Sequence, residues 1–402
     1  MNELSLLVAL LTLLAGLSIG KAWERYKLRD GRWIDRRRAR ESPHYILGLN
    51  FLVSNQIDLA IEELGKAALH LNKEALEIDM ILGNLYREKG QVGRAIQVHQ
   101  ELLQRPKLTK LEQAYVQLCL GLDFKRGGFV DRAHEAFSEV LRLDPHNRYA
   151  LVNLEKLHED QHQWTEAYEI RRKLAAAAEA DESQGNNAIL AFLENELGMQ
   201  AARRGDDDEA ASRFEAAIDL APATAPAYLN LGDVRLRQGR PADAIAIWER
   251  MIAVAPERAY LAFDRIEAAS AGTERFPALC RRLIEANPKD WRARLALARQ
   301  TSPRDPAAAL DLLFDALVHN PHSVTLHQEI WRTLTRLGLD RRLVERYIEL
   351  TGSAVFYHDP HVCIRCRYRS TELLWQCPHC HEWNTFVEDR IAPAKEGEEA
   401  PS

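Results

Sequence analysis

Four of the six cysteines in this 402-residue chain lie near its C-terminal end, in two C-x-x-C pairs. They are Cys363 and Cys366, then Cys377 and Cys380. Two such pairs, called knuckles here, can place four thiolates at the corners of a tetrahedron around one metal ion. Four sulfur ligands leave no open position for water, so the predicted site is structural rather than hydrolytic. Zinc is the default ion, and iron is the alternative because four thiolates suit it as well.

The small domain predicted at 357–389 depends on this ion. A segment of that size has too little apolar core to fold alone, so the metal must hold it together. Arg367 and His381 follow the second cysteine of each knuckle, where glycine is usual, which argues against a redox role more than against a structural one. Trp375 and Trp383 flank the second knuckle and are predicted to pack on the rest of the chain or on a partner.

A second group of residues suggests hydrolytic chemistry. His158, Glu159 and His162 spell H-E-x-x-H, in which two histidines on one helix bind zinc and the glutamate is the general base. A membrane-tethered metalloprotease is therefore a remote alternative. We expect His162 at the turn that ends the helix, which would separate the two histidines. We therefore predict no catalytic residue and no enzymatic activity.

The elements that position these groups are predicted to be helices. Residues 113–147 predict two amphipathic helices joined by a glycine turn. The first helix carries a large, a small and an aromatic residue, and the second carries an alanine and a bulky residue before a closing proline. The residues are Leu120, Gly121, Phe124, Ala133, Phe137 and Pro145. This order resembles the tetratricopeptide repeat. One such hairpin cannot bury its own apolar face, so it implies neighbours.

The pattern recurs on both sides of this stretch, at Leu47-Gly48, Leu82-Gly83, Leu197-Gly198 and Leu231-Gly232. Ala210 and Ala244 are separated by the 34 residues expected of the repeat. We therefore predict an all-α solenoid of about nine repeats over 41–350. The polar stretch within 180–190 interrupts the period, and it indicates either a joint between two half-solenoids or a longer loop.

Repeat solenoids bind extended peptides or helices in the groove lined by the first helix of each repeat. Extrapolating the repeat register gives a candidate partner-binding groove of mixed polar character. Its residues are Tyr45, Asn84, Arg87, Lys125, Arg126, Asn195, Arg203, Asp233 and Arg237. For each of them the alternative is an ordinary solvated helix face.

The N-terminal residues predict a membrane anchor. Leu4–Gly20 is apolar and uncharged, and at about 1.5 Å per residue it just spans a hydrocarbon core. Positive charge follows the apolar run, which predicts a single-pass helix over 1–20 with a periplasmic N-terminus and the repeats in the cytoplasm. The G-x-x-x-G formed by Gly16 and Gly20 would also permit a homodimer.

The basic segment 21–40 carries nine basic and three acidic residues, a charge of +6 in a chain of net charge −6. We interpret it as a juxtamembrane segment that lies against anionic headgroups. The rest of the chain is acidic, which argues against a nucleic-acid partner. The tail at 390–402 is acidic and rich in proline and alanine, and we expect it to be disordered.

Taken together, the predicted anchor, the repeats and the four cysteines resemble the lipopolysaccharide assembly protein B family of Gram-negative bacteria. The segment around Cys377 also looks like the zinc ribbon of the RadA recombination family, but the nucleotide-binding loop of that family is missing from the sequence. The first resemblance implies a rubredoxin-type domain and an adaptor in the inner membrane. It also implies that the adaptor promotes proteolysis of the deacetylase LpxC by the membrane protease FtsH and contacts the lipopolysaccharide export machinery. A general scaffold for envelope complexes is the alternative function.

Overall fold

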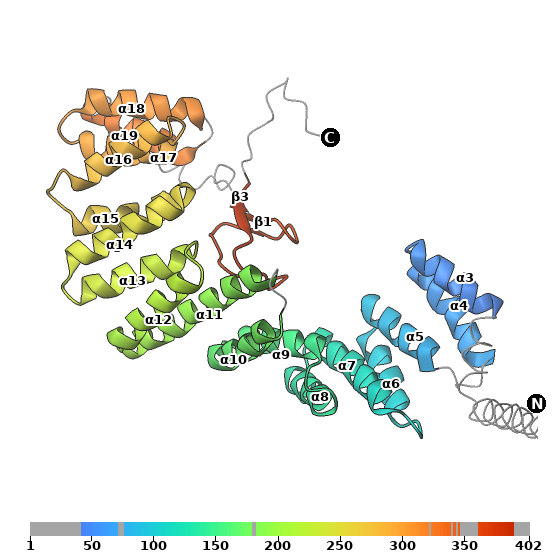
Figure 1. Cartoon of the computed structure of the whole chain (residues 1–402). Coiled ribbons are helices and arrows are strands. Elements are labelled where there is room, and N and C mark those ends of the chain that lie inside the picture. Colours follow the sequence, from blue (N-terminus) through green and yellow to red (C-terminus); the bar gives the residue numbers. More distant parts are fainter. Residues whose placement is uncertain are drawn as a thin grey trace, which may run out of the picture. The chain divides into compact units, whose positions relative to one another are not determined.

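The computed structural model of the chain describes residues 42–70, 76–178, 182–320, 323–338, 341–342, 345 and 361–389 (Figure 1). The predicted anchor, the basic segment and the acidic tail lie outside these residues. Within the described ranges, no helix has both the length and the apolar character needed to cross a bilayer. The chain divides into two compact units between Gln163 and Trp164.

The first unit is built from consecutive helices. They are α3 (Pro43–Val53), α4 (Ile57–His70), α5 (Leu76–Glu88), α6 (Val92–Leu103), α7 (Lys110–Arg126), α8 (Val130–Leu143) and α9 (Arg148–Asp160). Helices pack in pairs, α3 on α4, α5 on α6 and α7 on α8, and each pair packs on the next through α4 on α5, α6 on α7 and α8 on α9. This is the arrangement that a tetratricopeptide array requires.

The second unit continues the helices and adds a small sheet. Its helices are α10 (Trp164–Ala176), α11 (Ser183–Arg204), α12 (Asp207–Leu220), α13 (Ala225–Arg237), α14 (Pro241–Val254), η2 (Pro256–Ala262), α15 (Phe263–Ala269), α16 (Arg275–Ala286), α17 (Trp291–Thr301), α18 (Pro306–His319) and α19 (Val324–Arg336). The strands are β1 (His361–Cys363), β2 (Arg369–Ser370) and β3 (Phe386–Glu388), in the order β2-β1-β3 with antiparallel pairing. The predicted all-α repeat solenoid with a C-terminal cysteine domain is confirmed.

Several helices begin at residues that satisfy the free amide groups of the first turn. Thr109 and Glu112 form a reciprocal capping box at the start of α7. Asn147, Asp206 and Asp305 accept hydrogen bonds from backbone amides at the starts of α9, α12 and α18. These local signals fix where these four helices begin.

The glycine of each repeat allows its two helices to approach closely. A Cβ atom added at Gly121 would lie 2.6 Å from Phe137, and one at Gly232 would lie 2.1 Å from Trp248. The same relation joins each glycine to the residue sixteen positions later, in the pairs Gly48 and Leu64, Gly83 and His99, and Gly198 and Phe214. Since a backbone passes so close to a large side chain, only glycine fits these positions.

One repeat departs from this rule. Glu155 stands at the position of the glycine, next to Leu154, and its side chain is fully buried. The division between the two units falls after this position, between α9 and α10. In the polar stretch expected to hold a joint, residues 183–190 instead form the first turns of α11, while 180–181 lie outside the described residues. The joint itself stays a prediction.

His99 holds the bulky position of the second repeat and carries charge into the core. Its ring is fully buried, and Nδ1 lies 2.5 Å from a carboxylate oxygen of Asp123, which is also fully buried. Arg87 donates to the other oxygen of Asp123 at 2.9 Å. Burial alone would lower the pKa of His99, but the hydrogen bond to Asp123 outweighs it and raises the pKa from 6.5 to about 9.

The raised pKa predicts a pH-dependent stability for the first unit. Because folded His99 holds its proton more tightly than the unfolded chain does, its contribution is complete below pH ~6.5 and is lost as the pH rises toward 9. The loss should amount to about 3 kcal/mol, because the pKa rises from 6.5 to about 9 and each tenfold change in proton affinity corresponds to ~1.4 kcal/mol. Hydrogen exchange of α5 to α7, corrected for the intrinsic rates at each pH, would measure it.

The matched control for this prediction is His99→Phe, which gives the second repeat the residue that the third repeat has in Phe137. The variant should lose the extra sensitivity between pH 6.5 and pH 9. If its protection falls with pH as steeply as that of the natural chain, His99 is not the group responsible.

Candidate metal centre

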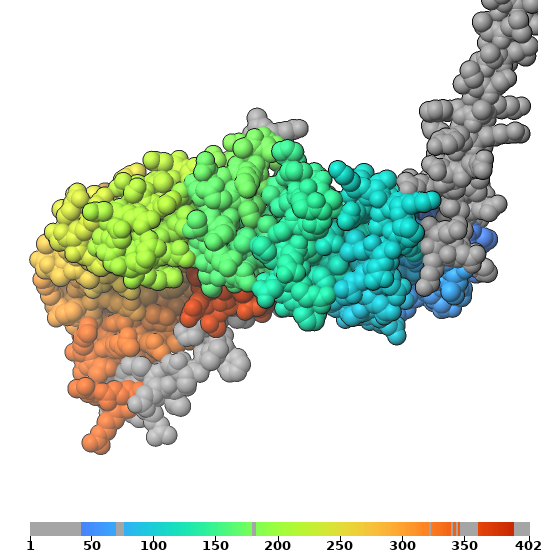
Figure 2. All heavy atoms as spheres, turned by 90° about the horizontal axis from the view of Figure 1, so that it is seen from below, coloured from blue at the N-terminus to red at the C-terminus, as the bar shows by residue number. Residues whose placement is uncertain are grey.

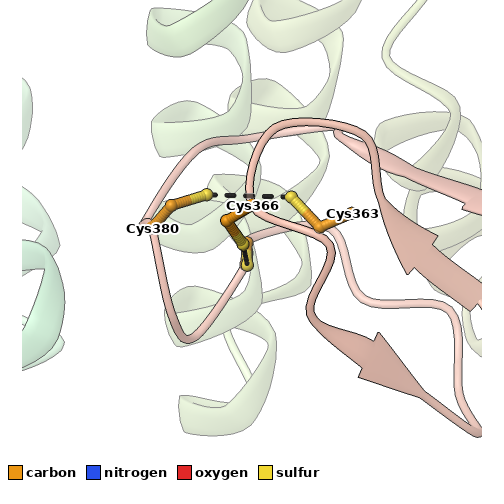
Figure 3. A group of neighbouring side chains, drawn as sticks. Cys363, Cys366 and Cys380 are labelled. Atoms are coloured by element: carbon orange, nitrogen blue, oxygen red, sulfur yellow. Dashed lines mark hydrogen bonds between the residues drawn. The ribbon is translucent and has the colours of Figure 1, made fainter.

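The structure brings the four predicted cysteines together. Their sulfur atoms all lie within 4.8 Å of one another. Figure 3 shows the side chains of Cys363, Cys366 and Cys380 gathered at one point. The Sγ atoms of Cys363 and Cys380 are 3.7 Å apart, and those of Cys366 and Cys377 are 3.6 Å apart. A tetrahedron with metal–sulfur bonds of ~2.3 Å has edges of ~3.8 Å, so these spacings fit one ion. Among the described residues, this is the one cluster of such side chains that could hold a metal.

The two knuckles share one backbone geometry. The amide of Arg367 donates to the carbonyl of Cys363 at 2.9 Å, and the amide of His381 donates to that of Cys377 at 2.8 Å. Arg367 and His381 have φ values of 64° and 56°, in the left-handed region that favours glycine. Each knuckle thus keeps the turn that glycine usually makes. The departure noted in the sequence is accommodated by local strain, not by a different fold.

The electrostatics of the thiols favour a bound cation. Burial raises the pKa of Cys380 to about 12. Burial also opposes ionisation of Cys363, but the Thr385 hydroxyl at 3.2 Å and the amides of Cys366 and Arg365 outweigh it and lower its pKa to about 6. One thiolate therefore forms readily, while the full set needs a positive ion at its centre. Zinc and iron both satisfy this requirement.

The metal domain lies against the helices of the second unit (Figure 2). Its two tryptophans contact α11. Trp383 stacks on Phe192 of α11, with ring centroids 5.2 Å apart and planes inclined by 18°. Its ring also lies 6.2 Å from that of Trp164. Trp375 lies 6.4 Å from Phe192, and the guanidinium carbon of Arg258 lies 5.2 Å from the centre of the Trp375 ring. Of the two predicted roles for the tryptophans, packing on the chain is the one observed.

An ion pair closes the other side of this contact. Arg292, at the start of α17, pairs with Glu388 of β3, and its guanidinium lies 4.3 Å from the centre of the Tyr260 ring. Beside the pair is a cavity of about 550 Å³ that Tyr260, Trp291 and Glu388 help to line. No motif in the sequence marks Phe192, Arg258 or Arg292 as docking residues, because each looks like an ordinary residue of a helix surface.

The H-E-x-x-H residues are not arranged as metal ligands. The helix α9 ends at Asp160, and His162 lies beyond it with a φ of 57°. Nδ1 of His158 lies 2.6 Å from Oε1 of Gln163, and the ring packs edge-on against His134 at 5.4 Å. The predicted turn at His162 is therefore present, and His158 occupies a core position.

The residues predicted to line a groove have different environments. Tyr45 and Asn195 are buried, Asn84 is half-buried, and Arg126 and Arg203 are exposed. The other four form polar contacts with residues of neighbouring helices. They are Arg87 with Asp123 at 2.9 Å, Lys125 with Asn153 at 3.4 Å, Asp233 with Arg265 at 2.9 Å and Arg237 with Asp207 at 2.6 Å.

Three of these contacts, those of Arg87, Lys125 and Asp233, belong to a ladder between adjacent first helices that sequence reasoning missed. Tyr45 to Glu77, Asn230 to Asn195 and Gln300 to Glu267 are further steps, with partners 32, 35 and 33 residues apart. The signal in the sequence was a pair of polar residues separated by about one repeat length. Such residues meet because equivalent positions of adjacent first helices lie side by side. Most of the predicted groove residues therefore hold neighbouring repeats together, and a role for them in partner binding stays a prediction.

Known proteins share both parts of this architecture. Residues 361–388 match the family model of the rubredoxin metal binding domain, and residues 45–107 and 195–269 match that of the tetratricopeptide repeat. Lipopolysaccharide assembly protein B of Haemophilus influenzae is 27% identical over 359 residues, covering 86% of this chain and 89% of that protein. Its counterpart of the same name in Escherichia coli K12 is 24% identical over 353 residues, with the same coverage.

The similarity extends beyond either domain by itself, since it covers most of both chains. The chain combines tetratricopeptide repeats with a C-terminal domain that matches the rubredoxin metal binding domain, and over most of its length it is similar to lipopolysaccharide assembly protein B.

Proposed function

We propose that this chain is a membrane-anchored adaptor that regulates lipopolysaccharide biosynthesis through protein–protein contacts. The observation that carries the proposal is the stacking of Trp383 and Trp375 on Phe192, which joins the metal domain to the repeat surface of the second unit. A partner could then contact repeats and metal domain at once. The name of the relatives supports the lipopolysaccharide pathway as the setting.

The chemistry of the site supports an adaptor over an enzyme. Four cysteines fill the coordination sphere of a zinc or iron ion, so the ion would hold the fold and leave no position for substrate. The contribution of the chain would then be to raise the effective concentration of one bound protein beside another.

The membrane is part of the proposal through residues outside the described ranges. The apolar stretch at 4–20 would cross the inner membrane with the N-terminus in the periplasm, and the basic segment at 21–40 would lie at the cytoplasmic headgroups. The repeats would then be held beside other proteins of the same membrane.

The finer proposal names the partners. By the family resemblance, the anchored repeats would bring the deacetylase LpxC to the membrane protease FtsH and would also contact the lipopolysaccharide export machinery. In cells whose own adaptor gene is replaced by this chain, LpxC should have a short half-life. A half-life as long as that of cells without any adaptor would overturn the assignment. Capture of envelope complexes without any effect on LpxC would favour the general scaffold.

Glu159→Gln separates the adaptor from the metalloprotease alternative. Glu159 is buried, with 2% of its surface exposed, and glutamine has nearly the same shape. We therefore expect the variant to regulate LpxC to within about twofold of the natural chain. A protease would lose its general base and with it several orders of magnitude in rate. The LpxC half-life, measured together with the thermal stability of the variant, checks this prediction.

A further inference from the structure

The first helix of the array has an apolar face that no described helix covers. Ile46 and Leu47 of α3 are 51% and 42% exposed, and Val53 is 88% exposed. Asn50, one turn after Ile46, is exposed as well. These four positions form a stripe along α3, because residues three and four apart lie on one side of a helix. We call it the α3 face.

Two of the four positions, those of Leu47 and Asn50, are covered in other repeats. The leucine before the repeat glycine is Leu82, Leu120 or Leu231 in later repeats, and these side chains are 6%, 4% and 3% exposed. The position of Asn50 is held by Leu85 and Val234, at 5% and 1% exposure. In these repeats the second helix of the preceding pair packs on the first helix of the next, as α6 packs on α7 and α12 on α13. No described helix precedes α3.

The residue types also indicate that something covers the α3 face. Counting from the repeat glycine, Val53 is equivalent to Glu88, Arg126, Arg203 and Arg237. A position that is charged in those repeats is thus apolar in the first one. The end of a solenoid usually carries a polar outer face, so an apolar one indicates that something covers it.

We propose that residues 21–40 of this same chain cover the α3 face, in the place that the second helix of a preceding repeat would take. Only residues 41–42 separate the segment from α3, which begins at Pro43, and the link between α8 and α9, residues 144–147, is also short. It supplies apolar side chains for the face in Trp23, Tyr26, Leu28, Trp33 and Ile34. Its charge of +6 also complements the first hairpin, which has three acidic residues and one basic residue over 42–70.

This arrangement would connect the predicted anchor rigidly to the array. The basic side chains of the segment would remain available for lipid headgroups while its apolar side chains hold α3. The inference does not depend on the lipopolysaccharide role, since it concerns only how the chain is joined to the membrane.

Photo-crosslinking of the full chain in lipid nanodiscs tests the proposal. Ile46 is replaced by p-benzoylphenylalanine, and Tyr149 of α9, which is 73% exposed, is replaced in the control. We expect Ile46 to crosslink to a peptide within 21–40 and Tyr149 not to do so. Mixing chains of light and heavy isotopes identifies the crosslinks made within one molecule. Crosslinks of Ile46 to a second copy or only to lipid, or no crosslink at all, would overturn the proposal.

Val53→Glu provides a second test that does not depend on a crosslink. It installs the residue that stands at this position in the second repeat as Glu88. If 21–40 covers the face, the variant should release the segment and speed tryptic cleavage between Arg32 and Arg40 by about tenfold, the effect of about 1.4 kcal/mol. The matched control, Arg126→Glu, should leave the cleavage rate unchanged. Equal cleavage of Val53→Glu and the natural chain would mean that the face is open to solvent.

Discussion

Replacing Cys377 and Cys380 together by serine is expected to remove the metal ion and to unfold the metal domain. Bound zinc and iron should fall from one ion per chain to less than about a tenth, because serine hydroxyls are poor ligands and two thiolates cannot hold the ion. The domain has few buried residues besides the cysteines, with Phe386 the largest of them. Metal analysis and tryptic cleavage at Arg365 and Arg369 would measure the two effects.

Loss of the metal should also change the contact between the metal domain and the repeats. Trp375 and Trp383 lie on either side of the second knuckle, so they can stack on Phe192 only while the knuckle is held. Phe192 would then become exposed and regulation of LpxC would be lost. Cys280→Ser is the control for the same chemical change, since Cys280 is buried among the repeats and lies outside the cluster. A double variant that retains one ion and resists trypsin would contradict the account of the site.

Trp383→Ala is expected to release the metal domain from the repeats while leaving the metal in place. The variant removes the ring that stacks on Phe192 and lies beside Trp164. A half-buried aromatic ring of this kind should contribute about 2 kcal/mol, less than the full cost of deleting a buried tryptophan. Hydrogen exchange in the part of α11 around Phe192 should then rise by about thirtyfold, with the metal content unchanged.

The control for docking is Tyr368→Ala. Tyr368 is 40% exposed, and its ring contacts His379 and Phe386 within the metal domain. This variant should leave the exchange of α11 as it is in the natural chain. If Trp383→Ala also leaves α11 unchanged, the two tryptophans do not hold the domain on the repeats. If Trp383→Ala loosens the domain but LpxC regulation persists, docking is not needed for the adaptor.

The repeats and the metal ligands could be predicted because each depends on local spacing. A glycine followed sixteen residues later by a bulky side chain is a pattern within one hairpin, as in Gly121 and Phe137. The C-x-x-C knuckles likewise fix their own turns. Both signals survive even where single residues depart from the pattern, as Arg367 and His381 do.

The docking contacts could not be predicted from the sequence, because they join residues far apart in the chain. Phe192 and Trp383 are separated by nearly two hundred positions, and neither belongs to a motif that names its partner. The groove prediction left out contacts between neighbouring repeats. It placed residues such as Arg87 and Asp233 on one side of their helices, but it did not consider that the next repeat supplies Asp123 or Arg265 to pair with them.

Reconstitution is the most direct test of the central claim that the chain acts by holding other proteins together at a membrane. FtsH and the full chain would be placed in the same proteoliposomes, and the degradation rate of added LpxC would be followed with and without the chain. We expect LpxC degradation to be at least several-fold faster with the chain, and we expect no acceleration with the variant that lacks Cys377 and Cys380. An unchanged rate of LpxC degradation when the chain is present would contradict it.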